Sequence, residues 1–457
     1  MTVKDNIVFI SLAQNQSQFF ERVGKNMVQA GFGVVHVCFH EGAVKDLRAS
    51  GSEVFNPYDY QVSSTDHVNF DDYDITNPSL LLGHEKSAYN LSDTNALQLK
   101  FKRHLAAMDA ILRSLLKRGG NWCLVQELGG FTSVLAAYYA GRRLGIKNWF
   151  LEPSFFRGRM FFTSNTLDAP RIPDAVGEVS EEVKSIIESI VRNSIVVIPA
   201  KDRMHYRGPF NKLFDPKNVR RLFQKLAAKH LRGEQEEFQH IRLHVARHVR
   251  MLVNSLILSH RYQLLPAGQR FIYYPLHVPG DFALTIRSPE YLDQYALIDY
   301  LCRVAPLGYR VVIKEHPALV GAVSPSRIKD LCARHDNFAL LPPSLNNHEV
   351  LAAADAVITV NSKSGAEALL HGTPVVVLGN AFYEDCPLVH RVNGLADLQD
   401  ALNRALDKTA TFNVSSILPF FQQVWDASFP AELYDLTPNN ISNFSHSLAR
   451  LFRKNST

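Results

Sequence analysis

Two runs of alternating apolar and amphipathic segments constrain this chain more than any other feature of its sequence. The first begins with IVFISL (7–12), FFERVGKNMVQAG (19–31) and GVVHVCFH (33–40), which predict a strand, a helix and a strand. Strands joined through a helix pair in parallel, because a tight turn can only join antiparallel neighbours. The alternation continues to a predicted strand at 147–152, so we expect an α/β domain within residues 1–200.

A second alternation runs from RFIYYPLHV (270–278) through YRVVIKEHP (309–317) to VITVNSKSGAEALLHGTPVVVLG (357–379). The chain has 457 residues, more than one hydrophobic core usually serves. We therefore predict an α/β fold of the GT-B type, with two Rossmann-like domains whose parallel sheets face a central cleft. The expected order is a first domain, a basic helical connection, a second domain and a helix that packs back on the first domain: 1–200, 201–265, 266–430 and 431–457.

Composition excludes several classes of protein. No stretch approaches the roughly 20 apolar residues of a membrane span, and the first residues are too polar for a secretory leader. The five cysteines are scattered without a C-x-x-C pair, which favours free thiols in a reducing compartment and no structural metal. We therefore expect a cytoplasmic protein.

Positive charge is concentrated in one segment. Between Lys201 and Arg261 there are 14 Lys and Arg residues against 5 Asp and Glu residues, and KNVRRLFQKLAAKHLRG has the pattern of a basic amphipathic helix. This segment is either a solvated helical face or a surface that attracts anionic lipid head groups or a polyanionic substrate. Aromatic residues are not interleaved with it, so we do not expect nucleic acid as a partner.

Polar residues follow two strands of the second alternation. Lys314, His316 and Pro317 stand where YRVVIKEHP ends, and a Lys and a His at a strand end suit a phosphate group. The loop N-S-K-S-G lies between the next predicted strand and helix. One serine would cap that helix. The second hydroxyl would form an anion nest together with the backbone N–H groups of the loop. The residues that we expect to bind the phosphate and ribose of a nucleotide in this loop and helix are Asn361, Ser362, Ser364, Gly365 and Glu367.

Four blocks of the chain resemble the capsule polysaccharide synthesis family, in particular the KpsC/KpsS type of β-Kdo glycosyltransferase and more closely the KpsS type. The blocks follow the order of the family and span nearly the whole chain. They are NQSQFFERVGKNMVQAGFGVVHVCFHEG (15–42), GIKNWFLEPSFFRGRMFFT (145–163), YYPLHVPGDFALTIRSP (273–289), and VVIKEHP together with VITVNSKSGAEALLHGTPVVVLG.

The resemblance implies a retaining transfer of Kdo from CMP-Kdo through a covalent enzyme–sugar intermediate. Asp281 occupies the position of the family's aspartate in the third block and is the implied nucleophile. Glu152 matches the glutamate that opens the second block and is the implied general base, since the acceptor hydroxyl must lose a proton. Glu127, at the end of another predicted strand, is the rival for that role. The implied CMP-binding positions are His316, Ser362 and Ser364.

The chain departs from the family pattern near the expected sugar site. His277 stands where the family usually has Gln, and E-P-S-F-F-R replaces E-x-G-Y-x-R. Arg157 or Arg159 is then expected to pair with the carboxylate of an acidic sugar or with an acceptor phosphate, although each suits a surface position equally well. With Arg287 of the third block and His277, they make up the expected substrate-binding set.

Three functions stay open at this point. The first is a β-Kdo transferase that needs no cofactor besides its CMP-sugar donor and no metal, and that acts on a lipid-linked or glycan acceptor. The second is a transferase of the same fold with sialic acid, another sugar or a polyol phosphate as donor. The third is a non-catalytic component of capsule assembly or export. For the first we expect a place at the inner membrane face of a bacterium, with contacts to anionic lipids and capsule assembly proteins.

Overall fold

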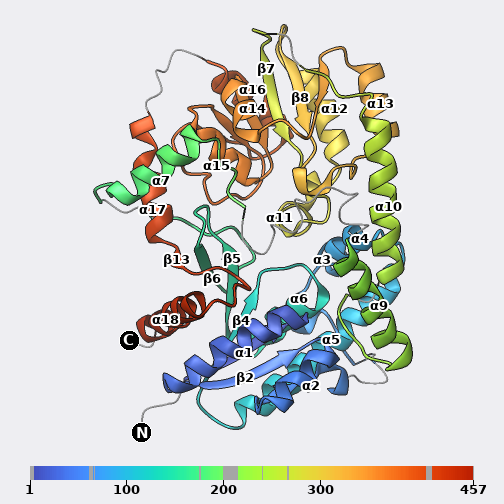
Figure 1. The fold of residues 1–457 in the computed structure, drawn as a ribbon, viewed down its shortest axis with the longest axis vertical. Coiled ribbons are helices and arrows are strands. Elements are labelled where there is room, and N and C mark those ends of the chain that lie inside the picture. Colours follow the sequence, from blue (N-terminus) through green and yellow to red (C-terminus); the bar gives the residue numbers. More distant parts are fainter. Residues whose placement is uncertain are drawn as a thin grey trace.

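The chain folds into two sheets with helices packed beside each of them, one sheet in each half of the molecule (Figure 1). The computed structural model describes residues 5–60, 65, 67–173, 177–198, 215–238, 240–264, 267–407 and 414–455. The predicted α/β class, with one sheet in each half, is confirmed. Residues 199–214, the first part of the predicted basic connection, lie outside the described residues.

The first sheet is mixed, whereas the sequence predicted a parallel one. Its strand order is β13-β6-β5-β4-β1-β2-β3, and β1 to β5 pair in parallel. β6 pairs with β5 antiparallel because a short turn joins them, in which Gly158 adopts a φ of 76°, and β13 pairs antiparallel with β6. The strands are β1 (Asp5–Ser11), β2 (Gly33–Cys38), β3 (Val54–Phe55), β4 (Asn121–Glu127), β5 (Lys147–Pro153), β6 (Arg159–Ser164) and β13 (Phe429–Pro430).

The second sheet is parallel throughout, as predicted. Its strand order is β12-β11-β10-β7-β8-β9. The carboxyl ends of parallel strands meet at one edge, which is where α/β sheets bind ligands. The strands are β7 (Phe271–Pro275), β8 (Arg310–Lys314), β9 (Phe338–Leu341), β10 (Ala356–Thr359), β11 (Val375–Val377) and β12 (Val389–Arg391).

Helices cover both faces of the first sheet. Successive residues of β1 illustrate this, because Ile7 and Phe9 are buried in one apolar cluster and Val8 and Ile10 in another. The helices of the first half are α1 (Gln14–Gln29), α2 (Glu41–Ala49), α3 (Pro78–Leu81), α4 (Gly83–Tyr89), α5 (Thr94–Leu116), α6 (Thr132–Arg143) and α7 (Glu181–Arg192). The helices α3 and α4 lie in a polar segment, 59–89, that shows no helical periodicity in the sequence.

Two long helices, α9 and α10, follow along one side of the molecule and connect the halves (Figure 1). None of the helices in the described ranges is long and apolar enough to cross a membrane. The helices from this point on are α9 (Pro216–Leu231), α10 (Ile241–Leu258), α11 (Phe282–Thr285), α12 (Gln294–Val304), α13 (Pro325–Arg334), α14 (Asn347–Ala353), α15 (Lys363–Leu370), α16 (Leu398–Ala405), α17 (Leu418–Asp426) and α18 (Pro438–Asn455).

The chain crosses between the halves more than once. As predicted, the last helix returns to the first sheet, where the ring of Phe444 on α18 lies 5.0 Å from that of Phe19 on α1. Conversely, α7 belongs to the predicted first domain, 1–200, but it packs on the second sheet. Its residues Val183 and Ile187 are buried in the apolar cluster of that sheet. The exact domain boundaries stay a prediction.

Candidate active site

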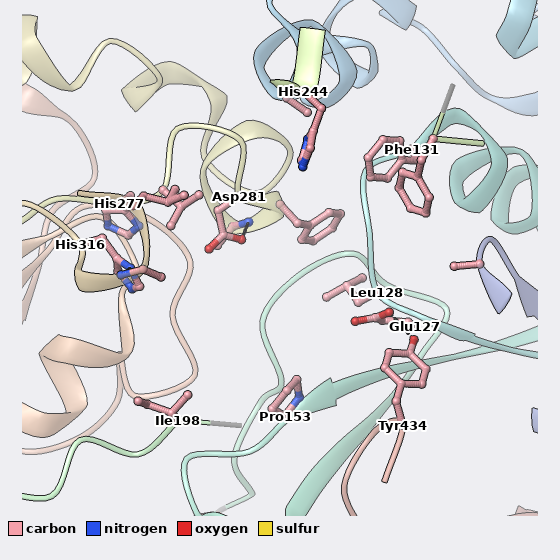
Figure 2. Close-up of a pocket in the computed structure, with 18 of the residues that line it drawn as sticks. Glu127, Leu128, Phe131, Pro153, Ile198, His244, His277, Asp281, His316 and Tyr434 are labelled. Atoms are coloured by element: carbon pink, nitrogen blue, oxygen red, sulfur yellow. Dashed lines mark hydrogen bonds between the residues drawn. The ribbon is translucent and has the colours of Figure 1, made fainter. Parts of the chain in front are cut away.

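A cavity of about 2360 Å³ lies between the two sheets (Figure 2). The loops after the strands of the second sheet form one wall, and β4 and β5 of the first sheet contribute the opposite wall. The predicted site residues that line it are Glu127, Glu152, His277, Asp281, Arg287, Lys314, His316, Pro317, Asn361, Ser362, Ser364 and Glu367. The fold thus brings most of the predicted residues to one place.

Asp281 lies at the start of the short helix α11 and points into the open space of the cavity (Figure 2). One carboxylate oxygen accepts the N–H of Ala283 at 3.1 Å, which fixes the side chain as a helix cap. His277 is buried nearby, with Nε2 3.3 Å from the hydroxyl of Thr359. Burial lowers the pKa of His277 to about 4 despite the charge of Asp281, so the imidazole is neutral at pH 7.

β8 ends at Lys314, which is followed by His316 and Pro317. The Lys314 ammonium donates to the carbonyl of Leu345 at 2.8 Å, and burial lowers its pKa to about 8 against the opposing charge of Glu367. His316 Nδ1 accepts the N–H of Ala318 at 3.2 Å, so a neutral ring has its proton on Nε2. The strand end therefore offers a cation and an N–H donor at the cavity wall.

Ser362 and Ser364 have different roles, which the loop sequence alone did not separate. Ser362 caps α15, because its hydroxyl accepts the N–H of Ser364 at 3.2 Å. The Ser364 hydroxyl instead accepts from the amide of Asn347 at 3.2 Å. The same amide donates to Glu367 at 2.9 Å, and burial raises the pKa of Glu367 to about 7.

Asn347 is a site residue that the sequence analysis missed. It is the first residue of α14, and its side-chain oxygen accepts the hydroxyl proton of the buried Tyr273 at 3.0 Å. Tyr273 lies on β7, so Asn347 links three elements that are far apart in the chain. A lone Asn in a polar loop gives no signal of such a role.

Two further residues of the N-S-K-S-G loop serve the packing of the wall. The Asn361 amide donates to the carbonyl of Ala283 at 2.7 Å, which ties the loop after β10 to the helix that Asp281 caps. Gly365 was predicted to bind the nucleotide, but it does not line the cavity. A Cβ there would lie 2.3 Å from the hydroxyl oxygen of Tyr383, so the glycine is needed for close packing.

On the opposite wall, Glu127 and Glu152 end β4 and β5. Glu127 accepts from the side-chain amide of Gln16 at 3.0 Å and from the hydroxyl of Tyr434, which also lines the cavity. Tyr434 lies just before α18 and has a φ of 65°, which L-residues adopt rarely. The returning C-terminal segment therefore orients Glu127 through Tyr434. No sequence motif near Glu127 predicts this contact.

Arg287 and Glu152 form a two-pronged ion pair across the two halves, with N–O distances of 2.8 and 3.2 Å. The guanidinium also donates to the carbonyls of Leu167 and Asp168, at 2.8 Å each. Four N–H donors of the guanidinium thus hold the halves together, and the substrate-binding role of Arg287, which lines the cavity, stays a prediction. Lys363 adds a contact of the same kind, from its ammonium to the carbonyl of Ser154 at 2.7 Å.

Arg157 and Arg159 were also predicted to bind substrate, and neither lines the cavity. Arg157 is exposed in the turn between β5 and β6. The guanidinium of Arg159 lies over the Trp425 ring at 3.9 Å and donates to the carbonyl of Trp425 at 2.8 Å. Arg159 therefore anchors α17.

The basic segment lines the same cavity. The cavity-facing residues of α9 include Arg221, Lys225 and Lys229, at the i, i+4 and i+8 spacing of one helical face. On α10, His244 and His248 line it, with their Nε2 atoms 3.2 Å apart (Figure 2 labels His244). The sequence predicted the amphipathic pattern of α9, but it did not show that the basic face of this helix lines the cavity.

Among the described residues, no group of three or more His, Cys, Asp or Glu side chains is placed to bind a metal ion. What the cavity offers is a cationic wall at Lys314, an exposed carboxylate at Asp281 and a second carboxylate at Glu127. This arrangement is suited to holding an anionic group and to placing a carboxylate near the atom next to it.

Comparison with known proteins gives one family match. Residues 218–413 match the model of a family described as "Capsule polysaccharide biosynthesis protein", a segment that contains Asp281, His316 and Ser362. Protein FixF of Sinorhizobium fredii is 34% identical over 134 residues, which cover 29% of this chain and 32% of FixF. The match thus spans about a third of that relative.

Solved structures show more distant likeness. One is Thermosulfurimonas dismutans KpsC, a β-Kdo 2,7 transferase, with 15% identity, a TM-score of 0.35 and coverage of 74% of this chain and 88% of that chain. Another is the UDP-GlcNAc 2-epimerase of Methanocaldococcus jannaschii, with 11% identity, a TM-score of 0.32 and coverage of 92% and 97%. The segment from α9 to the end of the second sheet is thus similar to a capsule polysaccharide biosynthesis family.

Proposed function

We propose that the chain is a glycosyltransferase of capsule or surface polysaccharide biosynthesis that transfers Kdo from CMP-Kdo to a lipid-linked or glycan acceptor with retention of configuration. The observation that most supports it is the position of Asp281 in the cavity, with phosphate-type donors on its own wall and the carboxylate of Glu127 opposite. The family match over 218–413 is consistent with this assignment.

The donor phosphate would bind at the strand ends of the second sheet. Lys314 supplies a positive charge, His316 an Nε2–H donor, and the N-terminus of α15 the positive end of a helix dipole. Ser364 and Asn347 would orient the ribose or base through Glu367, which lies one helical turn into α15. Several donors acting together are needed, because one helix N-terminus contributes only about 0.3–1 kcal/mol.

In the first chemical step, the Asp281 carboxylate attacks the anomeric carbon of Kdo. The bond between that carbon and the phosphate oxygen breaks, and CMP leaves as a phosphate monoester that needs no proton. The neutral imidazole of His277 near Asp281 does not neutralise the carboxylate, so the charge of Asp281 stays available for attack. The product of this step is a glycosyl ester on Asp281.

In the second step, the acceptor hydroxyl attacks the same carbon, Asp281 leaves as a carboxylate, and a base takes the hydroxyl proton. We assign the base to Glu127 rather than Glu152. Both oxygens of Glu152 are paired with Arg287, and a proton acceptor in that position would lose this ion pair. Glu127 is held by Gln16 and Tyr434, which are neutral donors.

The acceptor would enter along α9 and α10. The basic residues Arg221, Lys225 and Lys229 on the cavity side suit an acceptor with phosphate or carboxylate groups. An anionic glycolipid or a glycan of acidic sugars has that chemistry. A place at the inner membrane face, with capsule assembly proteins as partners, is part of the same proposal.

Intact-protein mass spectrometry after incubation with CMP-Kdo tests the proposal directly. We expect an adduct with the mass of one Kdo residue, lost on adding acceptor and absent in Asp281→Asn. Calorimetry with CMP separates a transferase from a non-catalytic assembly component, which would not bind the nucleotide. A panel of CMP-activated and other donors, scored by nucleotide release, distinguishes Kdo from sialic acid and from polyol phosphate donors.

A further inference from the structure

The outer face of α10 exposes a continuous apolar stripe. Val249, Val253, Leu256 and Ile257 follow the i, i+4, i+7, i+8 spacing that places side chains on one side of a helix. Each is between 45% and 65% exposed, and Leu264 just beyond the helix is 71% exposed. Apolar surface of this extent on one helix is unusual for a face that meets only water.

The stripe lies on the side of α10 that faces away from the cavity. Ile241, His244 and Val245 line the cavity, and none of the stripe residues does. Other side chains fix the helix to both halves of the molecule. The amide of Asn254 donates to the carbonyls of Gly321 and Val323, and the Arg247 guanidinium donates to the carbonyl of Ala88. The position of the stripe is therefore set by the fold.

The charged residues of α9 and α10 have one sign. Within their bounds, α9 and α10 contain eight Lys and Arg residues and no Asp or Glu. Of these, Arg242 and Arg250 are exposed on the same side of α10 as the stripe. An apolar band flanked by arginines matches a bilayer surface with anionic lipids, because the aliphatic side chains enter the acyl boundary and the guanidinium groups remain at the phosphates.

We propose that the outer face of α10 docks this protein on an anionic membrane surface. The N-terminal half of the same helix lines the cavity through Ile241, His244 and Val245, so a bilayer-anchored acceptor would reach the cavity beside the docked face. That consequence rests on the proposed function, whereas the docking itself does not. The apolar side chains of α10 dock the protein, and the basic face of α9 lines the cavity.

Co-sedimentation of the full chain with vesicles tests the docking. We expect binding to vesicles of phosphatidylcholine mixed with phosphatidylglycerol, weaker binding at high salt, and no binding to pure phosphatidylcholine. The double variant Val253→Glu with Leu256→Glu should bind about tenfold more weakly, because it removes apolar contacts and adds two negative charges. The matched control is Leu307→Glu, at a fully exposed leucine between α12 and β8, which should bind like the natural chain.

Three results would overturn the docking proposal: no sedimentation of the natural chain with the anionic vesicles, equal binding by the double variant, or a natural dimer that the double variant converts to a monomer. The last result would assign the face to contact between copies of this chain. Calorimetry with CMP on the same samples keeps the two proposals apart. Nucleotide binding without vesicle binding would overturn the docking alone, and vesicle binding without nucleotide binding would overturn the proposed function alone.

Discussion

The two walls of the cavity hold their functional side chains in different ways. On the second-sheet wall, Asp281, His316 and Ser362 each accept the backbone N–H of the residue two positions further along the chain. On the first-sheet wall, Glu127 is held by a residue 307 positions away and Glu152 by one 135 positions away. Local caps thus hold these three side chains on one wall, and contacts between distant segments hold the two glutamates on the other.

This difference implies that the two walls respond differently to substitution. A local cap survives when the side chain is replaced by another that accepts the same N–H group, so function can be lost while the fold is kept. A side chain held across the halves is different, because its removal leaves a buried partner unpaired and lowers stability as well.

The largest effect is expected on the local wall, from Asp281→Asn. Asparagine caps a helix as well as aspartate does, but it cannot form a glycosyl ester. We expect transfer to fall by a factor of roughly 10⁴ with no Kdo adduct in the intact mass, and thermal stability to stay close to that of the natural chain. Asp293→Asn is the matched control, since Asp293 caps α12 in the same way and lies outside the cavity. Transfer at the natural rate by Asp281→Asn would remove Asp281 from the mechanism.

The second effect concerns the ion pair between the walls. Arg287→Leu leaves Glu152 and two carbonyls without their donor, and we expect the free energy of unfolding to fall by about 3–5 kcal/mol. Urea unfolding measures it. Arg327→Leu is the matched control, because the exposed pair of Arg327 with Asp293 should contribute only about 0–1 kcal/mol. Equal losses in the two variants would contradict the role of Arg287 in holding the halves together.

A third experiment separates the two glutamates. Glu127→Gln should lower turnover by roughly 10²–10³ because the acceptor loses its base, and Tyr434→Phe by about tenfold because Glu127 is then less well oriented. The first chemical step needs no base, so both variants should still release one equivalent of CMP in a rapid burst. Glu152→Gln should lower stability more than turnover. If Glu152→Gln stopped after the burst and Glu127→Gln did not, the assignment of the base would be reversed.

The smallest expected effect is a pH dependence of the free energy of unfolding, which comes from Glu367. Its pKa is about 7 in the folded chain, above its ordinary value near 4.5, so the folded state binds the proton more tightly than the unfolded state does. The stabilisation is fully present below about pH 4.5 and is lost as pH rises to about 7. Between these two pH values, the free energy of unfolding of Glu367→Gln should fall by roughly 1–3 kcal/mol less than that of the natural chain. Urea unfolding at several pH values measures this difference. An unchanged slope would show that Glu367 is ionised in the fold.

The accuracy of the sequence predictions follows the same division between local and distant contacts. Apolar periodicity located the helices and parallel strands that alternate along the chain, because each pattern lies within one element. The turn from β5 to β6 and the short helices near residues 78–89 were missed, since their formation depends on packing rather than on periodicity. For the same reason Arg157, Arg159 and Gly365 were placed in a site that they do not line.

By itself, the sequence determined the α/β class, the loops after strands that contain His316 and Ser362, and the absence of acidic residues from the two basic helices. A residue and the N–H group two positions later are always neighbours, so such caps can be found in the order of residues alone. Only the tertiary structure decided that Arg287 pairs with Glu152, that Tyr434 orients Glu127 and that α10 turns one face to the cavity and an apolar face outward. These contacts join segments far apart in the chain, and their partners are set by how the two sheets and their helices pack.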